Sequence, residues 1–246
     1  MRARNWLRSF RKAVRPLLRP ARRWVWSPHE IWKRAILHEV AWWDHYLAVK
    51  RGEGYVYRTD PDAVLRSPLV IRALERMGKP DVAILDVGAG ALTNLGKTYP
   101  SYRLRIIAVD PLADHYDELL RKHSVSPPVR TIRCEGERLL KRFDRGTFDM
   151  AHANNALDHA YNPVRVIRNM VRVVRPGGYI ILRHRRNEGM AEGYRGLHQW
   201  DFDVVNGAFM IRHARGEVNV SHALFREATT EAALVGDEVH CLITRR

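Results

Sequence analysis

Short apolar segments alternate with segments of helical periodicity between residues 82 and 182, and this alternation constrains the fold more than any other feature. Parallel strands need crossover connections of this kind, which are usually helical and right-handed. We therefore expect an α/β fold of the Rossmann-like, doubly wound type, with a mostly parallel sheet. Five of its strands are predicted at residues 82–87, 105–110, 129–133, 148–152 and 179–182.

Helices are predicted between most of these strands. One should follow the glycine-rich turn at residues 88–90, and a second covers residues 114–123. A third starts at Asn162 and Pro163 and presents the apolar residues 166, 167, 170, 171 and 174 on one face. Beyond residue 186 the pattern weakens, and strands are predicted only at 209–213 and 238–244. These two would complete a seven-stranded sheet in a domain spanning residues 81–246.

Residues 28–80 are expected to form an N-terminal helical extension, or cap. Ser27, Pro28 and Glu30 form a helix start, because serine can cap, proline suits the first helical position and the glutamate completes a capping box. This helix would run to about Lys50 with Trp43 on its apolar stripe. A polar loop should follow, and then a second helix over residues 67–77.

Residues 1–27 form a separate basic, aromatic segment. Residues 1–26 contribute +9 to the net charge of +15, since they hold nine lysines and arginines and no acid. Such a segment suits peripheral contact with an anionic membrane surface. A tail partly packed on the body is an equal alternative, and nucleic acid is the less favoured third. Pro16 and Pro20 prevent one uninterrupted amphipathic helix.

The compartment is expected to be the cytoplasm, with a peripheral membrane location as a further possibility. Cys134 and Cys241 fit a reducing compartment, and their spacing is not that of a metal site, so no metal is expected. The chain contains no apolar run of about 18 residues that would cross a membrane. An arginine-rich, acid-poor start is also found in mitochondrial transit peptides, although the scarcity of serine here argues against one.

Gly88 and Gly90 lie in the turn directly after the first predicted strand. Glycine lets a backbone turn tightly and approach a ligand closely, and a following helix N-terminus offers free N–H groups. Asp110 ends the next strand, 22 residues after Gly88, where an acid can accept hydrogen bonds from ribose hydroxyls. These residues predict a nucleotide-bearing cofactor. The simpler alternative is a glycine turn beside a surface acid.

Two other cofactor classes are disfavoured by the same segment. The chain continues Ala91, Leu92 and Thr93 after Gly90, so the third glycine of the NAD-binding pattern is missing. The phosphate-binding pattern GxxxxGK[ST] does not occur either. The residues alone therefore indicate a nucleotide-type cofactor without identifying it.

Five motifs between residues 82 and 184 resemble those of class I S-adenosylmethionine-dependent methyltransferases of the methyltransferase-11 type. In chain order they are LDVGAG (85–90), VDP (109–111), CEGERL (134–139), FDMAHANNALDHAYNP (148–163) and RVVRPGGYIIL (172–182). The resemblance implies S-adenosyl-L-methionine as the cofactor. By position it assigns cofactor contacts to Asp86, Gly88, Ala89, Gly90, Asp110, Pro111, Glu135, Gly136 and Asn154.

The resemblance also implies roles within this set. The glycines would cradle the methionine portion, Asp110 would hold the ribose, and Glu135 would face the adenine amino group. Asn154 would lie near the reacting sulfonium. The simpler alternatives are a solvated loop acid at Glu135 and a helix cap at Asn154. Cys134 replaces the family's usual glycine, which would narrow the adenine pocket.

The acceptor side is expected in residues 186–246 and around the end of the fifth strand. A general base helps when the methyl acceptor is a hydroxyl. The candidates are His184, directly after that strand, and His198 paired with Asp201. Ordinary hydrogen-bonded histidines are the simpler alternative, as is a reaction without a base. Asp158 and His159, the acid–histidine pair of the fourth motif, are interpreted as structural.

These observations predict an enzyme that methylates a small-molecule, sugar or lipid-linked acceptor, with O-methylation favoured. An RNA methyltransferase is one alternative, but Asn154 and Asn155 are followed by Ala156 and Leu157 rather than by the Pro-Pro-Tyr or Pro-Pro-Phe of amino-directed nucleic-acid methylases. A non-catalytic module with a cofactor fold, recruited to a membrane, is the other. The presence of Gly88 and Gly90 argues against a module without cofactor binding.

Overall fold

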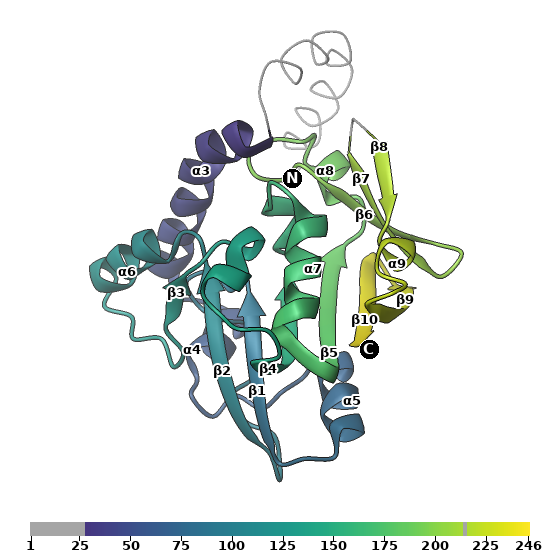
Figure 1. The fold of residues 1–246 in the computed structure, drawn as a ribbon. Coiled ribbons are helices and arrows are strands. Elements are labelled where there is room, and N and C mark those ends of the chain that lie inside the picture. Colours follow the sequence, from purple (N-terminus) through teal and green to yellow (C-terminus); the bar gives the residue numbers. More distant parts are fainter. Residues whose placement is uncertain (1–27, 214–215) are drawn as a thin grey trace, which may run out of the picture.

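The computed structural model describes residues 28–213 and 216–246 (Figure 1). The basic segment 1–26 and the predicted cap at Ser27 lie outside the described residues. Among the described helices, none is long and apolar enough to cross a membrane.

The central sheet has seven strands in the order β3-β2-β1-β4-β5-β10-β9. The five strands from β3 to β5 are parallel, and β10 runs antiparallel to both β5 and β9. This confirms the Rossmann-like, mostly parallel sheet and all five predicted core strands. Their bounds are Asp81–Val87 (β1), Arg103–Asp110 (β2), Thr131–Arg133 (β3), Phe148–Asn154 (β4), Val174–Arg185 (β5), Ala228–Val235 (β9) and Glu238–Arg245 (β10).

Two helices pack on opposite faces of this sheet, because side chains alternate between the faces of a strand. Leu85 of β1 packs with the face that carries α7 (Pro163–Val173), whereas its neighbour Ile84 packs with α5 (Pro68–Met77). Figure 1 shows α7 in front of β4 and β5. The predicted third helix is confirmed, but it ends at Val173, and Val174 already begins β5.

Two further long helices lie toward the β3 edge of the sheet (Figure 1). α3 (Pro28–Val49) and α6 (Ala113–Lys122) pack together through Trp43, Leu47, Tyr116 and Leu120. Both were predicted, as was α5. A short helix, α4 (Glu53–Thr59), replaces part of the expected polar loop. None of its residues is buried, so it leaves no apolar periodicity in the sequence. Short 3-10 helices cover Gly136–Lys141 (η1) and Leu157–His159 (η2).

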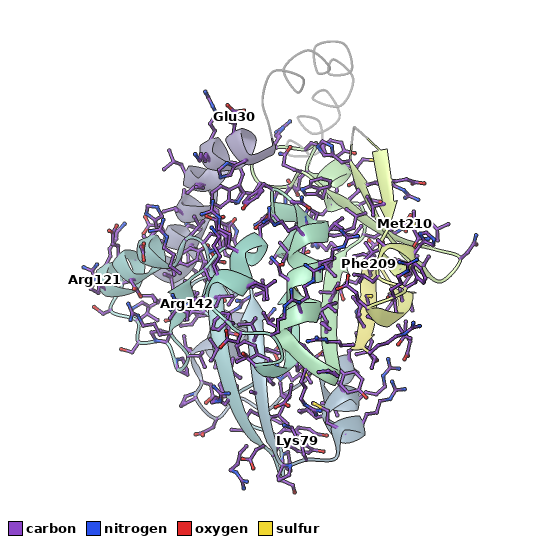
Figure 2. All side chains as sticks on the ribbon, viewed as in Figure 1. Glu30, Lys79, Arg121, Arg142, Phe209 and Met210 are labelled. Atoms are coloured by element: carbon purple, nitrogen blue, oxygen red, sulfur yellow. The ribbon has the colours of Figure 1, made fainter. Side chains whose placement is uncertain are left out.

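The last part of the chain departs from the prediction. The strand expected at 209–213 is β7 (Ala208–His213), but it belongs to a second, antiparallel sheet with β6 (Asp201–Val205) and β8 (Gly216–Asn219). Its Phe209 and Met210 lie on the opposite side of the molecule from Arg121 of α6 (Figure 2). The seventh strand is instead β9, which was not predicted. It is a mostly exposed edge strand, so its sequence, ATTEAALV, shows no clear apolar alternation.

The prediction of a helix after the glycine turn is wrong. Residues 88–102 contain no helix and form an irregular loop. Thr93 uses its hydroxyl within the loop, donating to Asp86 and accepting from the N–H of Leu95 at 3.1 Å. Further along, the loop bonds to the segment before α5, through Lys97 N–H to Ala63 O at 2.6 Å and Leu65 N–H to Thr98 O at 2.9 Å. These external bonds replace the internal bonds of a helix.

Gly96 allows this close contact between loop and cap, and we expect its replacement to destabilise the fold. A Cβ at Gly96 would overlap backbone atoms of Val64 and Leu65, which have no freedom to rotate away. Gly96→Ala should lower the free energy of unfolding by about 2–3 kcal/mol, measured by urea denaturation. The matched control is Gly54→Ala in α4, where the nearest atom, Tyr46 Oη, is 3.8 Å away. A Gly96→Ala protein as stable as this control would contradict the proposed contact.

Candidate active site

A cavity of about 580 Å³ lies at the carboxyl ends of β1, β2 and β4, with α3 as its outer wall. Ligands of open α/β sheets bind at this end of the strands, and the volume suits a small ligand. All nine predicted cofactor-binding residues line it: Asp86, Gly88, Ala89, Gly90, Asp110, Pro111, Glu135, Gly136 and Asn154. The structure thus brings together residues from four separate sequence motifs.

The turn after β1 has the conformation that glycine favours, with φ of 71° at Gly88 and 66° at Gly90. There is also no room for side chains. A Cβ on Gly88 would overlap the methyl group of Ala156, and one on Gly90 would overlap the indole of Trp43. The N–H groups of Gly88 and Ala89 donate to the carbonyl of Val109 at 2.8 and 3.2 Å. The turn therefore offers a close backbone surface, but not the free N–H groups expected from a helix N-terminus.

Asp110 joins this turn to the end of β2. Its Oδ2 accepts from the Gly90 N–H at 3.1 Å, and its Oδ1 accepts from the Leu112 N–H at 2.9 Å. Burial of the carboxylate raises its pKa to about 6, although these two hydrogen bonds oppose the shift. Each oxygen keeps a second lone pair, so an ionised Asp110 can still accept hydrogen bonds from a ligand.

Asp86 lies behind the turn and is almost fully buried. Its Oδ1 is 2.7 Å from Nδ1 of the equally buried His152 of β4, and its Oδ2 accepts the Thr93 hydroxyl. These partners indicate that Asp86 supports the loop. His152 was not singled out in the sequence, because its partner is 66 residues away.

The Cys134–Glu137 segment contributes two acids to the cavity. Glu135 is held by the Tyr161 hydroxyl at 2.8 Å and by Arg138 at 3.1 Å. Glu137 was missed, although it also lines the cavity and accepts the Asn162 N–H at 2.9 Å. Burial raises the pKa of Glu137 to about 7. Nothing in the sequence indicated that both acids of this segment would reach the cavity.

Cys134 does not narrow the cavity as expected. Its side chain packs with the buried residues of the α7 face and is absent from the cavity lining. Burial raises the pKa of the Cys134 thiol to about 11. Burial also raises the pKa of the Cys241 thiol. Gly136 is the residue that must stay small here, because a Cβ would press on Val166 of α7.

His184 lies away from the cavity. It is 1% exposed, packs on Phe202 with ring centroids 4.7 Å apart, and is absent from the cavity lining. Neither ring nitrogen has a hydrogen-bond partner among the described residues, and burial lowers its pKa to about 4. Of the two candidate histidines, only His198 faces the cavity.

His198 is held by Asp158 rather than by the predicted Asp201. Its Nδ1 is 2.6 Å from Oδ2 of Asp158, which is 1% exposed. Asp201 instead accepts from the Met190 N–H at 2.7 Å and from the Tyr194 hydroxyl. The predicted pair is therefore wrong, since contacts within the 189–201 turn occupy Asp201.

Asp158 and His159, interpreted as structural from the sequence, form a cluster with His198. His159 Nε2 lies 3.2 Å from His198 Nδ1 and 3.5 Å from Asp158 Oδ2. His159 and His198 both line the cavity. Burial would raise the pKa of Asp158, but the charges of His159 and His198 lower it. Asp158 and His159 are adjacent in the fourth motif, but nothing in the sequence indicated that His198 would lie beside them.

Helix α3 closes the cavity with aromatic residues. Trp32, Trp42 and Trp43 line it, whereas Tyr46 does not and instead stacks on Trp42 with ring centroids 5.2 Å apart. Trp43 also packs on Tyr116, and its Nε1 donates to Glu39 at 3.0 Å. The capping role expected for residues 28–80 thus falls mainly to α3.

A family model for a methyltransferase domain matches residues 85–182. The chain carries a class I S-adenosylmethionine-dependent methyltransferase domain. An uncharacterised methyltransferase of Schizosaccharomyces pombe is 32% identical over 105 residues, which are 39% of this chain and 37% of that protein. The chain therefore matches little more than a third of the length of this curated relative.

Solved structures with the same fold are more distant in sequence. A Burkholderia thailandensis 1,6-didemethyltoxoflavin-N1-methyltransferase, with 1,6-didemethyltoxoflavin and S-adenosylhomocysteine bound, has a TM-score of 0.51 and 14% identity. The match covers 90% of this chain and 91% of that one. The CurJ carbon methyltransferase has a TM-score of 0.50 and 13% identity, over 72% of this chain and 52% of that one. These likenesses agree with the sheet order of the methyltransferase fold.

We expect cofactor binding to weaken at acidic pH because Asp110 must be ionised to accept from a ribose. Its pKa of about 6 lies above the ordinary 3.8, so lowering the pH from 7.5 to 5 protonates it. The dissociation constant of S-adenosylmethionine, measured by calorimetry, should rise about tenfold over this range. Asp110→Asn should bind weakly at both pH values, since an amide cannot accept from both backbone N–H groups. An unchanged wild-type affinity at pH 5 would exclude this role of Asp110.

Proposed function

We propose that this chain methylates a hydroxyl group of a small-molecule, sugar or lipid-linked acceptor, using S-adenosylmethionine as the donor, in the cytoplasm. The observation that carries the proposal is one cavity lined by two chemically different groups of residues. The glycine turn and Asp110 form the cofactor end, and His159 and His198, held by Asp158, form what we take as the acceptor end. A cofactor and an acceptor can therefore meet within a single cavity.

The charges of the cavity support a cationic cofactor. Seven acidic residues and two arginines line it, in a chain of net charge +15. The acids are Glu39, Asp86, Asp110, Glu135, Glu137, Glu188 and Glu192. S-adenosylmethionine carries a sulfonium, an ammonium and a carboxylate group but no phosphate, so its net positive charge is favoured by an acidic cavity. The same excess of acids opposes entry of a polyanionic RNA, the alternative enzyme substrate.

The residues of this chain would act mainly by position. Bound in the cavity, S-adenosylmethionine supplies an electrophilic methyl group on its sulfonium. The turn and Asp110 hold the cofactor, and the wall of α3 excludes water from the space beside it. In-line alignment of the acceptor oxygen with that methyl group accounts for much of the rate. The Asp158–His159–His198 cluster would take up the proton that the acceptor hydroxyl loses when its oxygen receives the methyl group.

His198→Ala tests the role of the acceptor end. We expect turnover to fall by about 100-fold or more, because removal of acid–base assistance costs about that much. The dissociation constant of S-adenosylmethionine should stay within about threefold of wild type, since the cofactor residues lie elsewhere. The acceptor for this assay comes from a screen of lipid, glycan and small-molecule extracts with radiolabelled cofactor, followed by mass analysis of the product. His222→Ala, an exposed histidine of α9 (Val220–Ala223), is the control. Unchanged turnover, or an equal loss of cofactor binding, would remove His198 from the reaction.

Residues 1–26 support a peripheral membrane contact through their charge and tryptophans alone. The full chain should co-sediment with vesicles containing phosphatidylglycerol at low salt, and a chain lacking residues 1–26 should not. Binding should also fall as salt is raised, because the attraction is largely electrostatic. Failure of the full chain to bind anionic vesicles at low salt would exclude this contact and leave the methyltransferase proposal intact.

A further inference from the structure

Three nitrogen and oxygen atoms converge at the acceptor end of the cavity. The distances are 2.6 Å between Asp158 Oδ2 and His198 Nδ1, 3.2 Å between His198 Nδ1 and His159 Nε2, and 3.5 Å between His159 Nε2 and Asp158 Oδ2. We propose that Asp158, His159 and His198 bind a divalent transition-metal cation. The proposal rests on the proposed function for its purpose, which is to activate the acceptor hydroxyl.

Hydrogen bonding alone does not account for this triangle. His198 Nδ1 has either one proton or one lone pair, yet it lies within hydrogen-bond distance of two atoms. If it donates to Asp158, His159 Nε2 is left with the carboxylate oxygen at 3.5 Å, which is too long for a good bond. If it accepts from His159, its lone pair faces an acceptor oxygen 2.6 Å away. A single cation bound to all three atoms removes this conflict.

Two buried carboxylate oxygens beside the triangle also need a positive partner. Asp158 Oδ1 and Glu188 Oε2 have no hydrogen-bond partner among the described residues. The side chains of Asp158 and Glu188 are 1% and 7% exposed, so solvent does not satisfy these atoms. A buried carboxylate oxygen without a partner is costly, and a cation would offset that cost. The other oxygen of Glu188 already lies 3.6 Å from Arg185. Asp158 fits as a direct ligand, and Glu188 as a nearby acid that adds negative charge.

The surroundings of His159 resemble the outer shell of a metal site. Its second nitrogen, Nδ1, lies 3.8 Å from Glu39 Oε2, and the other oxygen of Glu39 accepts from Trp43 Nε1 at 3.0 Å. Metal-bound histidines commonly direct the second nitrogen toward a carboxylate, which orients the ring. Helix α3 would therefore contribute to the metal site as well as covering the cofactor end.

The donor set indicates which cations fit. Two imidazoles and one carboxylate suit Zn²⁺, Fe²⁺, Co²⁺ or Mn²⁺ better than Mg²⁺ or Ca²⁺, which prefer oxygen ligands. The side chains of His159 and His198 are 21% and 29% exposed, so the triangle opens on its cavity side. A hydroxyl oxygen of the acceptor can coordinate there, which lowers the pKa of the hydroxyl. With the cation bound, the histidines act as ligands, and the hydroxyl proton passes to water rather than to the cluster. The substrate class would then be an alcohol, phenol or sugar with an accessible hydroxyl.

The test uses tag-free, chelator-treated full-length protein titrated with Co²⁺, whose visible absorption reports imidazole ligation. We expect one Co²⁺ per chain, displaced by Zn²⁺. His159→Ala and Asp158→Asn should each raise the dissociation constant by at least about 100-fold, since even outer-shell changes cost about 10–100-fold. Glu39→Gln should raise it about tenfold. His222→Ala should leave it unchanged, and thermal unfolding of each variant checks that it is folded.

The outcomes separate this inference from the proposed function. Absence of stoichiometric Co²⁺ binding, or binding that survives both ligand substitutions, overturns the metal site. If the chelated protein also keeps full methyl transfer that His198→Ala abolishes, the proposed function stands without a metal. If the protein binds Co²⁺ as expected but transfers no methyl group to any hydroxyl acceptor, the metal site stands and the proposed reaction fails.

Discussion

The hydrogen bonds between Asp110 and the turn after β1 determine how the rest of the site is assembled. Because Asp110 and the carbonyl of Val109 bind the N–H groups of residues 88–90, this turn needs no helix after it. The chain then continues as a loop. The indole of Trp43 of α3 packs directly against Gly90, in the space that a side chain at residue 90 would take. The cofactor end thus depends on a helix that lies outside the matched domain of residues 85–182.

The fold was predictable where burial imposes a pattern. β1 and the centre of β5 are covered on both faces, so each contains a continuous apolar run. α7 is covered on one face and shows helical periodicity. β9 and α4 are largely exposed, and their sequences carry no comparable constraint. The loop after Gly90 was mistaken for a helix because its stabilising bonds come from residues 63–65, which a local pattern does not show.

The two ends of the site also differed in how far the sequence predicted them. Each predicted cofactor residue belongs to a local motif at a strand end, so its position follows once the parallel sheet is established. The acceptor end depends on pairing across the fold: His198 meets an acid 40 residues earlier in the chain, although Asp201 is only three residues away. Sequence proximity favoured the wrong partner. Within residues 28–213 and 216–246, Asp158 is a buried acid with one oxygen that lacks a hydrogen bond, and such an acid is recognised only when burial and geometry are known.

The charges at the cofactor end and at the acceptor end of the cavity would influence each other. A sulfonium at the cofactor end and a divalent cation at the acceptor end would repel each other across a cavity of about 580 Å³. Acidic residues of the cavity would reduce that repulsion. Glu39 of α3 is the clearest example, because it contacts both Trp43 and His159. When a methyl group leaves the sulfonium, the positive charge at the cofactor end disappears. A cation at the acceptor end would therefore favour the product state of the cofactor over the substrate state, and so promote transfer as well as activate the hydroxyl.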